Sequence, residues 1–461
     1  MVRIIIPRNN LPERHYIIEV LLDEFLGIDF EIQTDSNSSN YEIVVENGNR
    51  VIIEDHFFSK FKADQDYLNI GNLPEKIESA RHPFLPEKDL PVIYGTTGIN
   101  IREESSGQKS IICGIDLFAS SFFMLTRWEE YVSNKRDKLQ RFSAEYSIAF
   151  KNSFLNRPVV NEYCELLWNL LNHAGCKAIR KERHFTPYIT HDVDFIRRWN
   201  GVSSLLRALS GDLLKRRNLK LFFHNLKDFL YTKLKLKNDP YNTFDFLMTQ
   251  SERRGYKSHF FFISAHEPAR QGIYYKLSDP VAIQLMKDIQ TRGHSIGFHP
   301  DLNSFKDGER WKKELEQLKS FSPQEIVIGR QHYLQFEVPV TWQIWNDMGM
   351  VWDSTLSYDD KPGFRTGSCY TYSVYNFLTR KKLQLKEKPL IIMDKSLVMH
   401  HRGLSITQLE DMAKEIIDRV RKYRGDFVLL WHNSCLNIPE WENYKSIYLT
   451  ILDHLKQKTA P

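Results

Sequence analysis

The stretch Thr186-Pro-Tyr-Ile-Thr-His-Asp-Val-Asp194 decides how the second half of this chain is expected to fold. Tyr188–Thr190 is typical of the end of a buried strand, and polar residues follow it at once. Asp192 and Asp194 are two positions apart, so in extended backbone their side chains share one face. Two carboxylates this close repel each other unless a cation or a proton lies between them. The pair therefore indicates either a divalent-metal site with a second carboxylate left free as a base, or an Asx-type turn that closes the strand.

Strands and helices alternate from this stretch onward. Strand-like apolar runs are expected at Tyr188–Thr190, Ser258–Ile263, Ser295–Phe298, Ile326–Ile328, Leu390–Met393 and Phe427–Leu430. Helical spacing of apolar residues lies between them, at Phe244–Arg254, Pro280–Arg292, Arg310–Phe321, Val340–Met348 and Ile406–Tyr423. This alternation predicts a parallel α/β sheet or barrel, in which functional residues collect at the carboxyl ends of the strands.

The first 183 residues are predicted to be a separate, smaller α+β domain. Short β-rich runs at Val2–Ile6, Tyr41–Val45 and Arg50–Ile53 accompany a helical pattern at Leu11–Leu26. The basic stretch Lys177–His184 marks the boundary, so the predicted domains are 1–183 and 184–461.

An aromatic-rich amphipathic run, Ile115–Val132, also belongs to the first domain. Its residues Trp128, Glu129 and Glu130 either line a groove or, as we expect, combine core packing of the tryptophan with a solvated glutamate pair. No cluster of catalytic residue types stands out in this domain.

The composition narrows the class of protein. A length of 461 residues predicts two or three domains, and a net charge of +5 is too small for this length to indicate bulk nucleic-acid binding. The five cysteines are odd in number and lack Cys-x-x-Cys spacing, so neither a disulfide framework nor a zinc ribbon is expected. Met1–Pro7 reads as a first strand rather than a signal peptide, and no apolar stretch is long enough to span a membrane. We therefore expect a cytoplasmic protein without a transmembrane segment.

A basic insertion follows the first strand of the second domain, at about residues 197–240. Between Arg197 and Lys237 there are eleven lysines or arginines and two acids, Asp212 and Asp228. Apolar residues recur every three to four positions, which predicts a basic amphipathic helical hairpin. Such a hairpin either makes peripheral contact with an anionic membrane surface or packs on the domain with a solvated basic face.

Three later strands also end in residues that can bind a metal or move a proton. His299, the pair Arg330 and His332, and His432 each come at or just after the end of a predicted strand. One such histidine alone is more often structural, with satisfied hydrogen bonds. Four strand ends that carry Asp-x-Asp, His, Arg-x-His and His predict a single site with metal ligands, a base, an acid and a guanidinium.

These motifs resemble those of the polysaccharide deacetylase family, which is also called the NodB-homology domain or carbohydrate esterase family four. The resemblance covers about residues 186–435. The stretches 118–130 and 353–365 are similar to segments of a bacterial subgroup of the family that carries an extra N-terminal domain. The resemblance implies a distorted (β/α)7-8 barrel and metal-dependent removal of acetyl groups from N-acetylated sugars.

Carried over residue by residue, the resemblance also implies catalytic roles. Asp192 would be the general base, Arg330 would hold its carboxylate, and His432 would be the general acid. The carboxylate that orients His432 stays open among Asp394, Asp353 and Asp359. His294 matches a position that is usually structural.

For the metal, the resemblance implies that Asp194 and His299 are ligands. The family's next histidine falls on Asn303 in this chain, so the third ligand is Asn303, His332 or a water. An oxygen–nitrogen set of this kind suits zinc first, with cobalt, nickel or iron as alternatives.

The expected substrate is an N-acetylated glycan, free or linked to a lipid or a nucleotide, in the assembly of surface polysaccharides. Aromatic residues that could stack on a sugar are Phe364, Tyr370, Tyr372, Trp342, Trp345 and Trp431. Two other functions stay open at this point. One is an amidohydrolase acting on a small cyclic amide or ureide, and the other is an inactive sugar-binding or scaffold protein, which the departure at Asn303 would suit.

Overall fold

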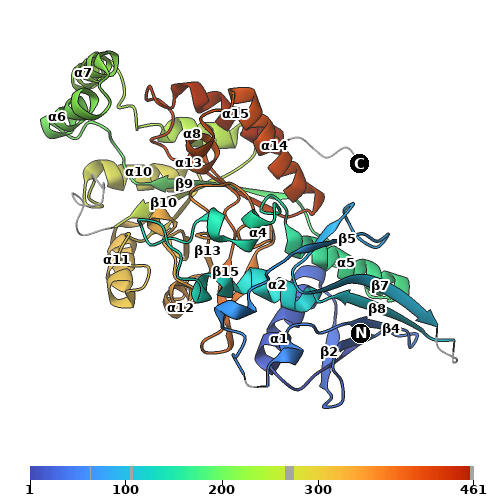
Figure 1. The fold of residues 1–461 in the computed structure, drawn as a ribbon. Coiled ribbons are helices and arrows are strands. Elements are labelled where there is room, and N and C mark those ends of the chain that lie inside the picture. The colour runs from blue at the N-terminus through green and yellow to red at the C-terminus, as the bar shows by residue number, and fades with distance from the viewer. Residues whose placement is uncertain (63, 104–106, 265–274, 457–461) are drawn as a thin grey trace. The chain divides into compact units, whose positions relative to one another are not determined.

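The computed structural model describes residues 1–62, 64–103, 107–264 and 275–456 (Figure 1). The chain divides into two compact units. Unit 1 comprises Met1–Thr186, Leu334–Ile391 and Asp418–Phe427, and unit 2 comprises Pro187–Tyr333, Ile392–Ile417 and Val428–Pro461. Both units combine helices with strands, so the mixed α/β class that the sequence predicts is confirmed.

Unit 1 is built on a six-stranded mixed sheet. The strand order is β2-β1-β3-β4-β8-β7, and the strands are β1 (Val2–Ile6), β2 (Phe30–Thr34), β3 (Tyr41–Val44), β4 (Arg50–Ile53), β7 (Gly95–Glu103) and β8 (Lys109–Ile115). A separate hairpin joins β5 (Glu78–Ala80) to β6 (Leu90–Val92). The helices include α1 (Leu11–Ile18), the π-helix η1 (Glu19–Leu26), α2 (Leu117–Thr126), α3 (Trp128–Val132), α4 (Ile148–Lys151) and α5 (Val159–Ala174).

Unit 1 also takes in a segment that the sequence assigned to the second domain. This segment holds α12 (Val340–Asp347), β13 (Trp352–Asp353), β14 (Tyr372–Asn376) and β15 (Lys381–Glu387). Its buried side chains explain the difference. The Tyr372 hydroxyl donates to the Leu125 carbonyl at 2.9 Å, the Tyr16 hydroxyl donates to the Ser373 carbonyl at 2.9 Å, and Tyr375 stacks on Tyr16. These long-range contacts leave no trace in local sequence patterns.

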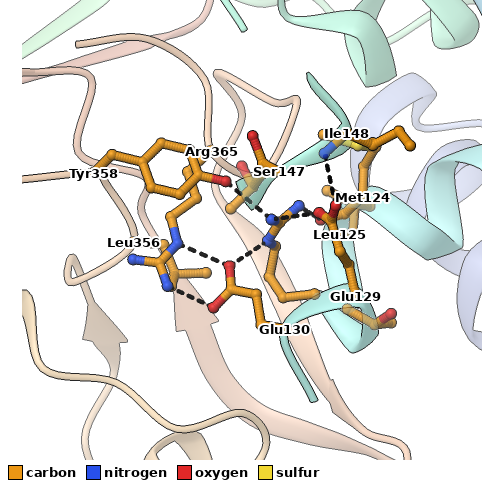
Figure 2. Close-up of polar contacts among 12 residues, drawn as sticks. Met124, Leu125, Glu129, Glu130, Ser147, Ile148, Leu356, Tyr358 and Arg365 are labelled. Atoms are coloured by element: carbon orange, nitrogen blue, oxygen red, sulfur yellow. Dashed lines mark hydrogen bonds and ion pairs between the residues drawn. The ribbon is translucent and has the colours of Figure 1, made fainter. Parts of the chain in front are cut away.

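A buried ion network lies where α2 gives way to α3. The Glu130 carboxylate accepts hydrogen bonds from Arg127 Nε at 2.8 Å and from Arg365 Nε at 2.9 Å and Nη2 at 2.5 Å (Figure 2). Glu129 accepts from the same Arg127 and, at 2.6 Å, from the Ile148 backbone amide. Both glutamates are buried, so the expectation of a solvated glutamate pair is wrong. Local spacing could not reveal Arg365, which is more than two hundred positions away along the chain.

Replacing Glu130 with glutamine is expected to lower the free energy of unfolding by about 3–5 kcal/mol, because two buried guanidinium groups lose their shared anion. Chemical denaturation of the whole chain measures this loss. The same substitution at the exposed Glu75 is the control, with an expected change within about 0.5 kcal/mol. Equal small changes at the two positions would show that the network does not contribute to stability.

The network also makes stability depend on pH. Burial alone would raise the pKa of Glu130, but Arg365 and Arg127 lower it to about 2. A carboxyl group whose folded pKa lies below its unfolded value stabilises the fold above the unfolded pKa. Its contribution is therefore complete at neutral pH and is lost as the pH falls from about 4.5 towards 2.

Unit 2 is built on a run of six strands in the order β12-β11-β10-β9-β17-β16. These are β9 (Thr186–Val193), β10 (Ser258–Ile263), β11 (Ser295–His299), β12 (Ile328–Gly329), β16 (Ile392–Met393) and β17 (Asp426–Leu430). Pairings β9–β10, β10–β11, β11–β12 and β16–β17 are parallel. A strand therefore lies at every one of the six positions where the sequence predicts one in the second domain.

The helices of unit 2 lie between these strands along the chain. They include α6 (Val202–Ser210), the π-helix η5 (Gly211–Lys215), α7 (Leu219–Lys233), α8 (Phe244–Glu252), α10 (Pro280–Thr291), α11 (Gly308–Phe321), α13 (Asp394–Val398), α14 (Ile406–Lys422) and α15 (Lys445–Lys456). Across the described parts of the chain the strand order shows no closed sheet, so the barrel stays a prediction. In those same parts, every helix is too short or too polar to cross a bilayer.

Candidate active site and metal centre

Parallel strands bring the sequence motifs of unit 2 to one edge of its sheet. Asp192 is the next-to-last residue of β9 and pairs in register with Phe261 of β10. His299 is the last residue of β11 and pairs with Ile263 of β10. Carboxyl ends of neighbouring parallel strands share an edge. Side chains that follow β12, β16 and β17 therefore meet those of β9 and β11 there.

Three buried residues form a group that could hold a metal ion. Asp194, His299 and His332 each offer one ligand atom, and these atoms all lie within 4.8 Å of one another. Asp194 Oδ1 is 3.3 Å from His299 Nε2 and 3.6 Å from His332 Nε2. One carboxylate oxygen and two imidazole nitrogens match the ligand types of catalytic zinc sites.

Hydrogen bonding prepares His299 for this role. Its Nδ1 lies 2.7 Å from the Arg330 carbonyl oxygen, which can only accept, so the proton is on Nδ1. The lone pair of Nε2 then points at Asp194. Within the described residues, His299 Nε2 and Asp194 Oδ1 are buried and have no hydrogen-bond partner. When this ring is neutral, Nε2 and Oδ1 are two facing acceptors, and a divalent cation, or in its absence a second proton on the ring, satisfies both.

The two sequence candidates for the third ligand differ in position. His332 follows β12 in the short turn η6 (His332–Leu334), is buried, and belongs to the ligand group. Asn303 is exposed on the turn after β11. The geometry therefore favours His332 over Asn303.

Asp192 is held beside this group by an arginine. Arg330 Nη1 donates to Asp192 Oδ1 at 2.9 Å and to Thr190 Oγ1 at 2.9 Å, and its guanidinium lies over the Phe261 ring. The other oxygen, Asp192 Oδ2, is 3.7 Å from His299 Nε2. A charged hydrogen bond on one oxygen orients the carboxylate and leaves the second oxygen directed at the site.

His432 is oriented by a carboxylate of its own. Its Nδ1 donates to Asp394 at 2.9 Å and its backbone amide donates to the same side chain at 2.6 Å, while Nε2 is 3.8 Å from Asp194 Oδ2. Of the three candidate partners, Asp394 makes this bond. Asp359 instead pairs with Arg141 at 3.0 Å, and Asp353 accepts from Thr355 at 2.5 Å.

Charges around the group set its protonation. Burial opposes ionisation of Asp194, but the imidazoles and Lys395 around it hold its pKa well below the usual range. Burial, together with nearby positive charge, lowers the pKa of His332 to about 3, so this ring is neutral at pH 7. Burial alone would lower the pKa of His299, yet Asp192 and Asp194 raise it. In the metal-free chain His299 is thus the ligand that holds a proton most firmly.

Metal affinity is expected to rise with pH for this reason, since the cation must displace the His299 proton. The affinity should increase roughly tenfold per pH unit and level off only above the raised pKa of His299, which lies above about 6.5. Calorimetric zinc titrations from about pH 5.5 to 8.5 measure the slope. Affinity that does not change with pH would contradict this assignment of the proton.

Sequence reasoning missed Lys395. Opposing the effect of burial, the negative charges of Asp194 and Asp394 raise its pKa, so it is a fixed cation beside the site. It directly follows Asp394 at the end of the apolar run Leu390–Met393. The strand-end rule that identified the other motifs would have found Lys395 as well.

A second group, Asp394, His432 and Cys435, also has metal-ligand spacing. Burial raises the pKa of the Cys435 thiol well above its usual range, and the carboxylate already binds the imidazole Nδ1. A cysteine binds a metal as the thiolate, so this group suits a cation less well than the first group.

Two other histidines are structural. His294 Nδ1 accepts from the Ser258 amide at 2.8 Å and its Nε2 contacts Glu252 at 3.1 Å. His191 Nδ1 donates to the Trp431 carbonyl at 2.6 Å.

The aromatic residues proposed for sugar stacking are all buried, so that prediction is wrong: Phe364, Tyr370, Tyr372, Trp342, Trp345 and Trp431. They are core residues, as apolar side chains at helical or strand spacing usually are. Tyr333, by contrast, is 40% exposed, and its ring lies 4.2 Å from the His332 ring. Its φ of 57° is uncommon for an aromatic residue and places the ring at the site.

Comparisons with known proteins cover the two halves of the chain differently. A family model described as "Family of unknown function (DUF7033)" matches residues 2–175. The crystal structure of a candidate polysaccharide deacetylase from Mycobacterium smegmatis is 16% identical, with a TM-score of 0.38, over 60% of this chain and 86% of that chain. No curated protein matches.

Proposed function

We propose that this protein is a metal-dependent hydrolase that removes the acetyl group from an N-acetylated sugar. The observation that carries the proposal is the convergence of three pairs or groups at one sheet edge. They are the ligand group Asp194, His299 and His332, the pair Asp192 and Arg330, and the pair His432 and Asp394. A cation site, an oriented carboxylate and an oriented imidazole are what hydrolysis of an unactivated amide needs.

The proposed roles follow from these positions. A divalent ion held by Asp194, His299 and His332 would supply Lewis acidity for both the water and the acetyl oxygen. Asp192, oriented by Arg330, accepts the proton of the attacking water through Oδ2. His432, with Nδ1 fixed by Asp394, gives a proton from Nε2 to the departing amine. The products are acetate and the free amino sugar.

Acetate release tests this reaction. The purified chain, loaded with zinc, cobalt or nickel, is incubated with N-acetylhexosamines that are free, phosphorylated or attached to a lipid or a nucleotide. Acetate and one amine in equal amounts support the proposal. Turnover of cyclic amides or ureides without acetate would replace it with the amidohydrolase alternative. A chain that stays inactive with every added metal would favour the sugar-binding alternative. The departure at Asn303 suggested that alternative, and His332, which lies in the ligand group, offers another third ligand.

The basic insertion motivates the choice of a carrier-linked substrate. Ten of the 21 exposed large hydrophobic side chains in the described residues lie between Val202 and Leu236, a stretch that also holds eight basic residues. Exposed apolar and basic side chains together suit the surface of an anionic membrane. We expect salt-sensitive binding to vesicles that contain phosphatidylglycerol and none to phosphatidylcholine alone. Equal binding to both kinds of vesicle would remove this argument for a carrier-linked substrate.

A further inference from the structure

The insertion is a small folded element with its own core. Figure 1 shows α6 and α7 as a helical pair, and Trp199, Leu205 and Phe229 form a buried cluster between them. Ala208, Leu209 and Leu226 pack against that cluster. The element therefore has a defined shape on which a binding site can be built.

Both acids of the insertion are used internally. Asp212 is buried and accepts from Arg216 at 2.6 Å and from Asn225 at 2.7 Å. Asp228 is buried and accepts from Trp199 Nε1 at 2.6 Å and pairs with Lys237. A third acid, Asp239, lies at the end of the insertion and accepts from the backbone amides of Arg198 and Trp199. The carboxylates of the element are thus engaged internally.

A pocket of about 500 Å³ opens on this element. Five of its lining residues are basic, none is acidic, and the basic ones are Arg197, Arg198, Arg207, Lys215 and Arg216. The remaining wall includes the aromatic rings of Phe195, Trp199 and Tyr241 and the side chain of Leu214. A concave site lined by several arginines is suited to a multiply charged anion, because guanidinium groups bind phosphate oxygens in pairs.

Contacts within the protein hold the side chain of Arg198 in a fixed position in the pocket wall. Its backbone amide donates to Asp239 and its Nη2 donates to Asn225 at 2.9 Å, so the side chain is held in place over the Trp199 ring. Its Nη1 is buried and has no hydrogen-bond partner among the described residues. A buried guanidinium nitrogen without an acceptor is costly unless a ligand supplies one.

The positive charges of Lys237 and Arg198 act on His224 against the weaker opposing charges of Glu442 and Glu440. Burial, followed by the charges of Lys237 and Arg198, lowers the pKa of His224. Burial and then Arg198 likewise lower the pKa of Lys237. An anion in the pocket would relieve this repulsion.

The pocket is tied to the candidate active site through Asn433. Phe195, in the pocket wall, directly follows the metal-ligand candidate Asp194. Asn433 follows the acid candidate His432, and its Nδ2 donates to the carbonyls of Phe195 and Tyr241, both at 2.8 Å. The residues that follow Asp194 and His432 thus connect the wall of the pocket to two of the strand ends that carry the candidate site.

We propose that this pocket binds the phosphate or diphosphate group that joins an N-acetylated sugar to a lipid carrier. In a 2-acetamido sugar, the ring carbon that bears the acetamido group is bonded directly to the ring carbon that bears this phosphate. Phosphate bound in the pocket, whose wall includes the residue that follows Asp194, would direct the acetamido group towards the site. The lipid is favoured over a nucleotide because Leu214, in the pocket wall, is 77% exposed and Leu206 on the same element is 61% exposed. This inference rests on the proposed function only in taking the phosphate to be joined to an N-acetylated sugar.

Calorimetry on the full chain tests the pocket without turnover. The probes are inorganic pyrophosphate, farnesyl diphosphate below its micellar concentration, and uridine diphosphate. We expect saturable binding of farnesyl diphosphate and of pyrophosphate, with the former at least about tenfold tighter. Arg198→Gln and the exposed Arg207→Gln should each weaken both by about tenfold or more, as loss of a charged hydrogen bond does. Lys220→Gln, a basic residue of α7 that does not line the pocket, should change neither affinity.

Three results would overturn the proposal: no saturable binding, tighter binding of uridine diphosphate than of farnesyl diphosphate, or equal losses in the Lys220 and Arg207 variants. If Arg198→Gln does not fold, Arg207→Gln carries the comparison because its side chain is exposed. Acetate release is measured separately on a sugar without phosphate. Binding without acetate release removes only the deacetylase proposal, and acetate release without binding removes only the pocket.

Discussion

Replacing Asp192 with asparagine is expected to lower kcat for acetate release by about 10²- to 10⁴-fold, the usual contribution of a positioned general base. Asparagine keeps the size and the hydrogen bond from Arg330, but it cannot accept the proton of the water. Metal content should stay the same, because Asp192 is not in the ligand group. Initial rates and metal analysis of the same sample measure the two effects.

The exposed Asp288 of α10 offers a matched control. Asp288→Asn should leave both kcat and metal content unchanged. A fully active Asp192→Asn variant would show that another group accepts the proton. A variant that loses its metal as well would place Asp192 among the ligands, beside His299, whose Nε2 lies 3.7 Å from Asp192 Oδ2.

The second large effect is expected from the pair His332→Ala and Asn303→Ala. His332 offers its nitrogen 3.6 Å from Asp194 Oδ1, so its removal should lower zinc affinity by on the order of 100-fold or more and abolish activity at limiting zinc. Asn303 is exposed, and its removal should change neither quantity. Competition with a chromogenic chelator gives both affinities.

These two variants separate the ligand sets directly. A loss of metal in Asn303→Ala, with none in His332→Ala, would mean that the turn after β11 closes over the ion and that the family spacing holds in this chain. His299→Ala serves as the positive control, since His299 belongs to both ligand sets. Its variant should lose zinc whichever residue completes the site.

The sequence by itself predicted where the strands of unit 2 end and which residue types stand there. Hydrophobic periodicity and strand-ending polar residues are local properties, so Asp192, His299 and His432 could be placed at strand ends without coordinates. The parallel order of strands then predicted that these ends share an edge. The helical character of the insertion followed in the same way from apolar spacing.

Only the tertiary structure decided which distant residues face one another. His332 lies close to Asp194 and His299 whereas Asn303 is exposed, and Asp394 rather than Asp353 or Asp359 binds His432. Chain crossings and side-chain directions select among such candidates, which sequence spacing does not separate. Glu130 is buried against Arg365 for the same reason. The basic pocket likewise depends on how α6 packs on α7, since residues that line one cavity share no period along the chain. Local sequence sets the direction and type of each side chain, and long-range packing sets its neighbours.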